Sequence, residues 1–238
     1  ADDWFSFSVP EMFDVATEKE AWAYWRWRML RALVEPAEDY RALNALVEFF
    51  GAERTFVETS NCDMLHERSG ISPDRVREIH GSLGRLQCSG PCCDTLHPVD
   101  DATLQRLRSE LDWVPRCPAC QTRCLRPNVM IFGDGQLVHT ALEKQGQNFD
   151  EFKSSVADGA HGKKNWAVLE VGAGVVVSSI RYAAELLASE GAGLIRVNPS
   201  EDECAVMEVG GIGTRGKYFP LVARSNDALA ALAAELRL

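Results

Sequence analysis

The stretch NWAVLEVGAGVVVSSIRYAAELLASEGAGLIRVNPS, residues 165–200, decides the fold that we expect for this chain. Residues 165–174 are mostly apolar and run into a glycine turn, as a buried strand does before a helix. Residues 178–191 begin with serine and end with glycine, which predicts a helix, and residues 193–200 predict the next strand. A strand–helix–strand order needs a crossover connection and therefore predicts a parallel sheet.

The rest of the chain predicts further helices and strands around this unit. Pro36 separates two predicted helices, and Gly51 ends the second of them. A short helix is also expected after Ser72, because the next residue is a proline, which suits the first helical position. The predicted helices span 18–34, 37–51, 71–81 and part of 135–163, and a strand is predicted at 54–59 and a strand plus terminal helix at 218–236.

The composition predicts a globular protein and excludes two kinds of partner. Hydrophobic residues make up 46% of the 238 residues and there are six tryptophans, enough for a real core. A net charge of −10 argues against non-specific binding to nucleic acid, which needs a basic surface. No apolar run approaches the roughly 20 residues of a membrane helix, and no signal peptide is visible. We therefore expect a cytoplasmic protein.

Five of the eight cysteines lie between residues 88 and 120, in short segments that prolines interrupt. Cys117 and Cys120 form a CxxC pair, and Cys88 with Cys92 or Cys93 forms a second pair. Four thiolates from two such pairs can hold Zn²⁺ in a structural site, whereas a CxxC alone is also typical of redox proteins. We favour zinc, with Cys93 rather than Cys92 as the fourth ligand and Cys124 as a spare thiol.

Polar residues follow several of the predicted strands. Asn61 and Asp63 follow the strand at 54–59, where an open α/β sheet places its ligands, although an Asx turn is an alternative use of both. His80 precedes a glycine and lies eight residues before Cys88, the first expected metal thiol, a place where histidine also serves as an ordinary surface residue. The glycine turn at 172–174 offers free amides to an anion or nucleotide, and Asn198 ends the following strand.

These motifs, in this order, resemble the sirtuin (Sir2-like) family of NAD-dependent protein deacylases. TSNCDMLHERSG at 59–70 is similar to the family pattern TQNIDGLHxxAG, and IHGSLGRLQC at 79–88 to its HG motif before the zinc ligands. CPACQTRCLRPNVMIFGD at 117–134 resembles CPxCGGxLRPxVVxFGE. The resemblance extends from about residue 18 to the end of the chain and is weaker over 135–165.

The resemblance implies an α/β fold with a Rossmann-like parallel sheet and an inserted zinc-binding module. We expect one catalytic domain over 1–238. Its expected parts are a helical segment at 18–51, a zinc module at 85–128, and a Rossmann-like part formed by 54–84 and 129–238.

The resemblance also implies site residues. His80 is expected to be the general base that acts on the nicotinamide ribose hydroxyls, a task suited to the near-neutral pKa of histidine. Asn61 and Asp63, next to Ser60, are expected to position the ribose and the water at the glycosidic bond that is cleaved. The remaining NAD contacts are expected from Gly172, Gly174 and Asn198.

Substrate contacts are implied in two places. Val129, Phe132 and Gly133 are expected to line the acyl-lysine channel, where the backbone pairs with an extended substrate peptide. Trp25 and Arg28 resemble by position the Tyr-x-x-Arg that reads acidic acyl groups in some sirtuins, so removal of succinyl groups is a hypothesis.

The sequence departs from the family pattern at several positions. The GAGxS and PDFR motifs that bind the NAD phosphates are not in the sequence given, since no glycine precedes Gly51, and Ala1 falls about where they end. Closer to the expected site, the chain has Ser60 for Gln, Cys62 for Ile and Met64 for Gly. The pair at 173–174 is Ala-Gly, where the family has Thr-Ser.

The implied function is NAD-dependent removal of acyl groups from lysine, in which the acyl group passes to ADP-ribose and nicotinamide leaves. Zinc is the expected structural metal, NAD the consumed co-substrate and an acyl-lysine protein the partner. Two alternatives stay open. One is an NAD glycohydrolase or ADP-ribosyl transferase, which cleaves the same bond with another acceptor, and the other is a non-catalytic binding module.

Overall fold

The computed structural model describes residues 8–32, 34–157, 166–205 and 218–238. The α-helices are α1 (Glu18–Ala32), α2 (Glu38–Phe50), α3 (Leu65–Arg68), α4 (Asp101–Ser109), α5 (Thr140–Ala157), α6 (Ser179–Ser189), α7 (Glu201–Cys204) and α8 (Ser225–Leu236). The 3₁₀ turns are η2 (Pro10–Phe13), η3 (Ala52–Arg54) and η4 (Pro73–Arg75). The strands are β1 (Val57–Thr59), β2 (Val76–Glu78), β3 (Gly81–Cys88), β4 (His97–Pro98), β5 (Leu125–Val129), β6 (Ala167–Val171), β7 (Gly193–Asn198) and β8 (Tyr218–Val222).

The chain divides into two units, which we describe separately. The first comprises Ala1–Glu35, Thr59–Arg68 and Arg77–Gly146, and the second comprises Pro36–Glu58, Ser69–Val76 and Gln147–Leu238. No helix in the four described ranges has the length and apolarity that crossing a membrane requires.

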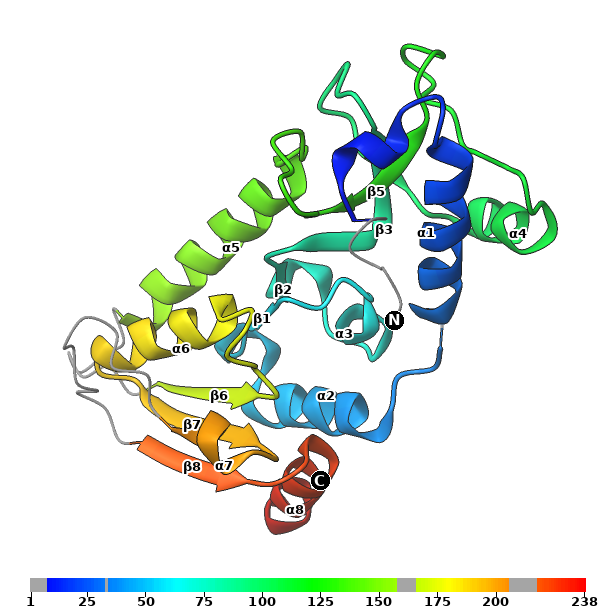
Figure 1. Ribbon diagram of the computed structural model, residues 1–238. Helices are drawn as coiled ribbons and strands as arrows, with labels where there is room; N and C mark the ends of the chain where they lie inside the picture. The colour runs from blue at the N-terminus through cyan, green and yellow to red at the C-terminus, as the bar shows by residue number, and fades with distance from the viewer. Residues whose placement is uncertain (1–7, 33, 158–165, 206–217) are drawn as a thin grey trace. The chain divides into compact units, whose positions relative to one another are not determined.

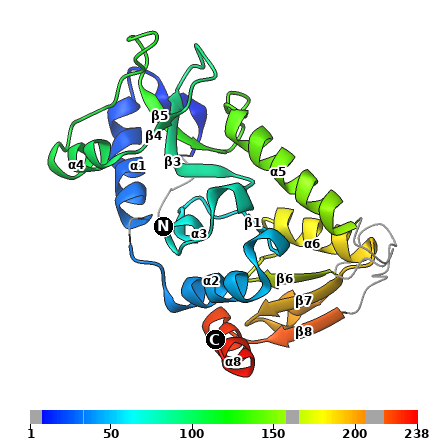
Figure 2. The ribbon, with the colours of Figure 1, turned by 180° about the vertical axis from the view of Figure 1, so that it is seen from behind.

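The first unit is built on an antiparallel sheet in the order β4-β3-β5. Figures 1 and 2 show α1 alongside β3 and β5 of this sheet. Trp22 of α1 donates its indole N–H to the Leu125 carbonyl at 2.8 Å. Trp22 and Trp25 are both buried in one core with residues of β3 and β5. Burial of two such large rings contributes several kcal/mol, roughly 2–3 for each large apolar side chain, so this core fixes α1 against the sheet.

The second unit contains the predicted strand–helix–strand. Strands β6, β7 and β8 form a parallel sheet in that order, with Val168 opposite Leu194 and Glu170 opposite Arg196. Helix α6 contacts β6 and β7, and its Ala184 and Ala188 pack against Leu194. The prediction of an α/β fold with a parallel sheet is confirmed, and the helix limits differ from the prediction by only one or two residues.

The predicted helix over 71–81 is wrong. The chain makes a single 3₁₀ turn at Pro73–Arg75 and then extends as strand β2, in which Val76 and Glu78 are buried and Arg77 is not. The Ile79 N–H that follows donates to the Thr59 carbonyl at 2.9 Å. β-Branched residues such as Val76 and Ile79 favour extended backbone, and this pairing overrides the helix start that Ser72-Pro73 provides.

Candidate functional site

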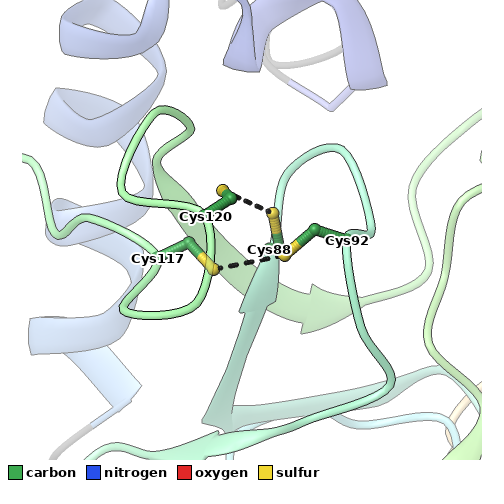
Figure 3. Close-up of side chains that lie close together, drawn as sticks. All are labelled: Cys88, Cys92, Cys117 and Cys120. Carbon is green, nitrogen blue, oxygen red and sulfur yellow. Dashed lines mark hydrogen bonds between the residues drawn. The ribbon is translucent and has the colours of Figure 1, made fainter.

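Four cysteine sulfurs of the first unit come together, as Figure 3 shows. The sulfurs of Cys88, Cys92, Cys117 and Cys120 all lie within 4.8 Å of one another. Cys88 ends strand β3 and its sulfur lies 3.9 Å from that of Cys120, while the sulfurs of Cys92 and Cys117 are 3.6 Å apart. Hydrogen bonds from Thr122 and the backbone lower the pKa of the Cys120 thiol to about 6, which favours the thiolate that binds metal.

These distances fit a zinc ion. Four ligands at 2.3 Å in a tetrahedron place their sulfurs about 3.8 Å apart, close to the two observed separations. The backbone supports the arrangement, because the Gln121 N–H donates to the Cys117 carbonyl and the Cys117 N–H donates to the Arg123 carbonyl, both at 2.9 Å. The Cys₄ cluster therefore has the geometry of a structural zinc site with no open position for catalysis.

The prediction that Cys93 completes the cluster is wrong, because Cys92 occupies that place. The loop after Cys88 turns through Gly90-Pro91 and directs Cys92 toward Cys117. Cys93, the next residue in this bend, lies outside the cluster, and its sulfur is 3.8 Å from that of Cys92. The spare thiol Cys124 is buried and donates to the Phe13 carbonyl at 3.6 Å, so it takes no part in the cluster either.

The segment after β1 carries the polar residues that the sequence singled out. Asn61 is exposed, and its N–H donates to the Thr59 hydroxyl at 3.1 Å. One oxygen of the Asp63 carboxylate accepts the Leu65 N–H at 3.0 Å at the start of α3. Asp63 therefore makes the bond of an Asx turn, the alternative that the sequence left open, and in the described part of the chain its second oxygen accepts no hydrogen bond. Met64 has φ 61°, in the left-handed region, where the family pattern has glycine.

His80 lies between β2 and β3 in the same unit. Its carbonyl accepts the Met130 N–H at 2.9 Å and the Cys62 thiol at 3.5 Å, which ties the residue to β5 and to the segment after β1. The imidazole is half-buried, and burial lowers the pKa of His80 below its ordinary value of 6.5. The ring is therefore neutral at pH 7 and can accept a proton.

Cys62 beside His80 does not form a catalytic thiolate pair. Burial, with the nearby Glu78 carboxylate, raises the pKa of the Cys62 thiol to about 12. The thiol therefore stays protonated at neutral pH, and nucleophilic catalysis requires a thiolate. Cys62 therefore does not have the thiolate that a Cys–His nucleophile needs.

Position 81, directly after His80, requires glycine because the backbone of a neighbouring strand lies very close to it. It has φ 79°, and a Cβ at this position would lie 2.1 Å from the Asn128 carbonyl oxygen of the neighbouring strand β5. No other residue fits this space without moving the backbone. The His-Gly pair thus fixes where the imidazole sits relative to β5.

The turn after β5 carries the predicted acyl-lysine contacts. Phe132 and Gly133 are exposed, whereas Val129 is buried in the core of the first unit. Asp134 ends the turn, and both of its carboxylate oxygens accept hydrogen bonds from Arg126, at 2.9 and 2.7 Å. The two side chains are at most 1% exposed, so this buried pair holds the turn in one conformation.

Trp25 does not have the exposure that a direct substrate contact needs. It is 1% exposed and packs in the core with Phe13. Its ring instead supports Arg28, whose guanidinium carbon lies 5.2 Å from the Trp25 ring centroid and 6.0 Å from that of Tyr24. Within the described ranges Arg28 forms no ion pair, so its charge remains available to a ligand.

In the second unit the structure brings the predicted glycine turn and Asn198 together. Gly172 has φ 67° and donates its N–H to the Val197 carbonyl at 2.9 Å. The Asn198 amide donates to the Ala173 carbonyl at 3.4 Å and to the Glu203 carboxylate at 2.8 Å. A side chain at Gly172 or Gly174 would meet no atom within 4 Å, so both glycines face open space.

Sequence reasoning missed the buried ionic groups beside this turn. Arg196 binds Glu170 through two hydrogen bonds of 2.6 and 2.9 Å and Glu185 through one of 2.8 Å. Arg181, 1% exposed, donates to backbone carbonyls of the same region. A single charged residue inside an apolar strand, such as Glu170 or Arg196, was the signal available in the sequence.

Comparison with known proteins identifies the family of this chain. The model of the Sir2 family matches residues 7–160, which is more than half of the chain. The chain belongs to the Sir2 family. It is 26% identical over 209 residues to a Corynebacterium glutamicum protein named NAD-dependent protein deacylase, which covers 87% of this chain and 73% of that one. An Archaeoglobus fulgidus protein named NAD-dependent protein deacylase 2 is 27% identical over 207 residues, 84% of this chain and 72% of that one.

Solved structures show the same fold. A structure from work on sirtuin substrate affinity has a TM-score of 0.63 and 21% identity, and covers 99% of this chain and 85% of its own. A Sir2 mutant with a p53 peptide and NAD has a TM-score of 0.60 and 22% identity, over 97% and 86% of the two chains. These similarities support the sirtuin fold that the sequence motifs predicted.

Proposed function

We propose that this protein is an NAD-dependent protein-lysine deacylase that transfers the acyl group to ADP-ribose and releases nicotinamide. The observation that carries the proposal is membership of the Sir2 family, over a range that includes the strand-end Asn61, His80 and the Cys₄ cluster. Relatives that align with most of this chain are named NAD-dependent protein deacylases. NAD is the co-substrate and zinc the structural metal.

His80 is the proposed general base. Its half-buried, neutral imidazole removes a proton from a ribose hydroxyl once the acyl oxygen has attacked the ribose and nicotinamide has left. Asn61 and the free oxygen of Asp63, with Ser60, are proposed to orient the ribose and water. Gly172, Gly174 and Asn198 are assigned to the rest of NAD.

Val129, Phe132 and Gly133 are proposed to form the acyl-lysine channel and peptide edge. The exposed Phe132 and Gly133, held by the buried Arg126–Asp134 pair, support this assignment. An extended substrate peptide binds such an edge through main-chain hydrogen bonds, so the substrate is a flexible protein segment that carries an acylated lysine.

Arg28 is proposed to select acidic acyl groups. It rests on two aromatic rings and has no ion-pair partner in the described part of the chain. A succinyl carboxylate would bind its guanidinium through two parallel hydrogen bonds. Arg28→Ala is expected to lower turnover of a succinyl-lysine peptide about tenfold relative to the acetyl peptide. If the ratio of succinyl- to acetyl-peptide turnover is the same in Arg28→Ala and the wild type, Arg28 does not select the acyl group.

The zinc is proposed to hold the module of residues 85–128 within a single catalytic domain over 1–238. Cys88, Cys92, Cys117 and Cys120 supply its four ligands. The eight cysteines form no disulfide, which is in keeping with a reducing compartment, and we propose the cytoplasm.

The deciding experiment is product analysis. The purified protein is incubated with NAD and an acetyl- or succinyl-lysine peptide, and the expected products are nicotinamide, deacylated peptide and O-acyl-ADP-ribose. Free ADP-ribose without peptide consumption would indicate an NAD glycohydrolase instead. Absence of NAD binding in calorimetry would indicate a binding module.

His80→Gln tests the base directly, with the exposed His139→Gln as the matched control. The first variant is expected to lose at least 100-fold in kcat and the second to retain activity. Because burial lowers the pKa of His80, the acid limb of the kcat/KM profile is expected below pH 6.5. An unchanged rate in His80→Gln would contradict the mechanism.

A further inference from the structure

Arg181 of α6 is a buried cation that the proposed chemistry does not yet use. It is 1% exposed, and in the described ranges it has no carboxylate partner. Its guanidinium instead donates to three backbone carbonyls, those of Ala173 at 3.3 Å, Glu203 at 2.5 Å and Ala205 at 2.8 Å. Burying a guanidinium without a carboxylate partner is unfavourable, and these three hydrogen bonds to backbone carbonyls offset part of that cost.

Arg181 contacts the glycine turn at residues 172–174 and helps to hold its backbone. The Ala173 carbonyl accepts from both Arg181 and Asn198, at 3.3 and 3.4 Å. The N–H of Gly172 is bonded to the Val197 carbonyl at 2.9 Å. The inner side of the turn is thereby fixed at the Val171–Gly172 and Ala173–Gly174 peptide groups.

Fixing the Ala173 carbonyl also fixes the next amide. In a trans peptide the C=O of one residue and the N–H of the following residue point in opposite directions. The Gly174 N–H is therefore directed away from Arg181 and Asn198. Among the described residues the Gly174 N–H has no acceptor, and none of their atoms lies within 4 Å of where a Cβ of residue 174 would stand.

We propose that Arg181 is a positioning residue that locks the Ala173–Gly174 peptide so that the Gly174 N–H donates to a phosphate oxygen of the dinucleotide. The inference rests on the proposed function, because it takes NAD as the ligand of this turn. A backbone amide between a strand end and the start of α6 is a common donor to phosphate. Arg181 acts through the peptide plane and does not itself touch the ligand.

Arg196 offers a matched control. It is also buried and also donates to the Ala205 carbonyl, at 2.8 Å, but its other partners among the described residues are Glu170 and Glu185 rather than the Ala173 carbonyl. Arg181→Lys and Arg196→Lys therefore disturb the same region, and only the first releases the turn. Arg181→Met removes all three hydrogen bonds and serves as a stronger second variant.

The test measures NAD and ADP-ribose affinity by calorimetry, steady-state kinetics, and thermal melting of each variant. Arg181→Lys and Arg181→Met are expected to raise the Kd and KM for NAD about tenfold while kcat and the KM for acyl peptide stay within twofold. Arg196→Lys is expected to melt at a similarly lowered temperature with NAD affinity unchanged. If Arg181 contributed only to stability, Arg181→Lys and Arg196→Lys would change the Kd for NAD by the same factor.

Two outcomes overturn the inference. The first is wild-type NAD affinity in both Arg181 variants. The second is an equal loss of affinity in Arg181→Lys and Arg196→Lys. If the wild-type protein itself binds no NAD, the proposed function fails and this inference fails with it. If the wild type binds NAD and the Arg181 variants behave like the control, only the role of Arg181 is wrong.

Discussion

The faces that the two sheets turn toward α1 and α6 differ in their use of charged residues. In the antiparallel sheet of the first unit, the side that faces α1 is apolar, with Leu86 and Leu125 packed on two tryptophans. In the parallel sheet of the second unit, the side that faces α6 begins with Val168 and Leu194 and continues, two residues on, with Glu170 and Arg196. Glu185 of α6 completes the ion pair.

The face of the first sheet only packs against its helix, whereas the face of the second sheet also holds its charged side chains in one arrangement. An apolar face needs only volume and shape, so many sequences satisfy it. A buried guanidinium between two carboxylates stabilises little by itself but permits few arrangements. The ionic end of the second face lies beside the glycine turn, which is where a fixed backbone is needed.

Zinc removal is expected to have the largest effect, confined to the first unit. Cys92→Ser should reduce zinc from about one per chain to almost none and lower the melting temperature, because the metal links β3 to the 117–120 knuckle. Cys93→Ser, the matched control outside the cluster, should keep its zinc. Metal analysis and amide hydrogen exchange measure both, with faster exchange expected in β3 and β5 but not in β6 and β7.

Zinc lost from Cys93→Ser and retained in Cys92→Ser would reverse the assignment of the fourth ligand. Loss of protection in both sheets would contradict the separate stabilisation of the two units.

Arg196→Met is the corresponding test of the second unit. It leaves Glu170 and Glu185 buried without their partner, so we expect a loss of about 3–5 kcal/mol in the free energy of unfolding. Arg54→Met, at an exposed position of the same unit, should change stability by less than about 0.5 kcal/mol. Replacing Arg196, Glu170 and Glu185 together by apolar residues should restore most of the loss, as chemical denaturation would show.

Gly81→Ala tests the close approach of strands in the first unit. Its positive φ and a 2.1 Å contact with the Asn128 carbonyl predict a loss of about 3 kcal/mol. Gly135→Ala, where a Cβ has open space, should have little effect. If both alanine variants denature at the same urea concentration, the backbone contact is not what makes glycine necessary after His80.

The smallest expected effect concerns Glu67. Burial, and then repulsion from Glu78, raises the pKa of the Glu67 carboxyl above its ordinary 4.5. The folded state then binds this proton more tightly than the unfolded state, so stability decreases as the pH rises from 4.5 through the folded pKa. Glu67→Gln removes that decrease and should melt slightly higher than wild type at pH 7 and equally at pH 4. A lower melting temperature of the variant at pH 7 would contradict the sign.

Much of the fold was predictable because local patterns and tertiary structure agree. Glycine and serine mark the ends of α6, and apolar runs mark β6 and β7, so these elements lie within three residues of their predicted limits. The predicted helix over 71–81 failed because Ser72-Pro73 begins only one turn before Val76 pairs as a strand. A start signal does not reveal where a distant strand offers hydrogen bonds.

The residues of the candidate site were also predictable only in part. The motifs located Asn61, Asp63, His80 and the CxxC pair, because their residue types and spacing carry the chemistry. Spacing did not separate Cys92 from Cys93, since either leaves a plausible loop, and only the path through Gly90-Pro91 selects Cys92. Trp25 appeared to be a substrate residue by position and is in fact buried beneath Arg28.

The sequence by itself determined the α/β class, the parallel strand–helix–strand, the thiol-rich module and the family motifs, because periodicity and ligand spacing are local properties. Only the tertiary structure decided which thiol joins the cluster, which tryptophan is buried, and that Glu170 and Arg196 face α6 instead of solvent. The physical reason is that side-chain burial and buried pairing depend on contacts between segments far apart in the chain. The proposed role of Arg181 likewise depends on the folded structure, in which its guanidinium donates to the Ala173 carbonyl and so sets the direction of the Gly174 N–H.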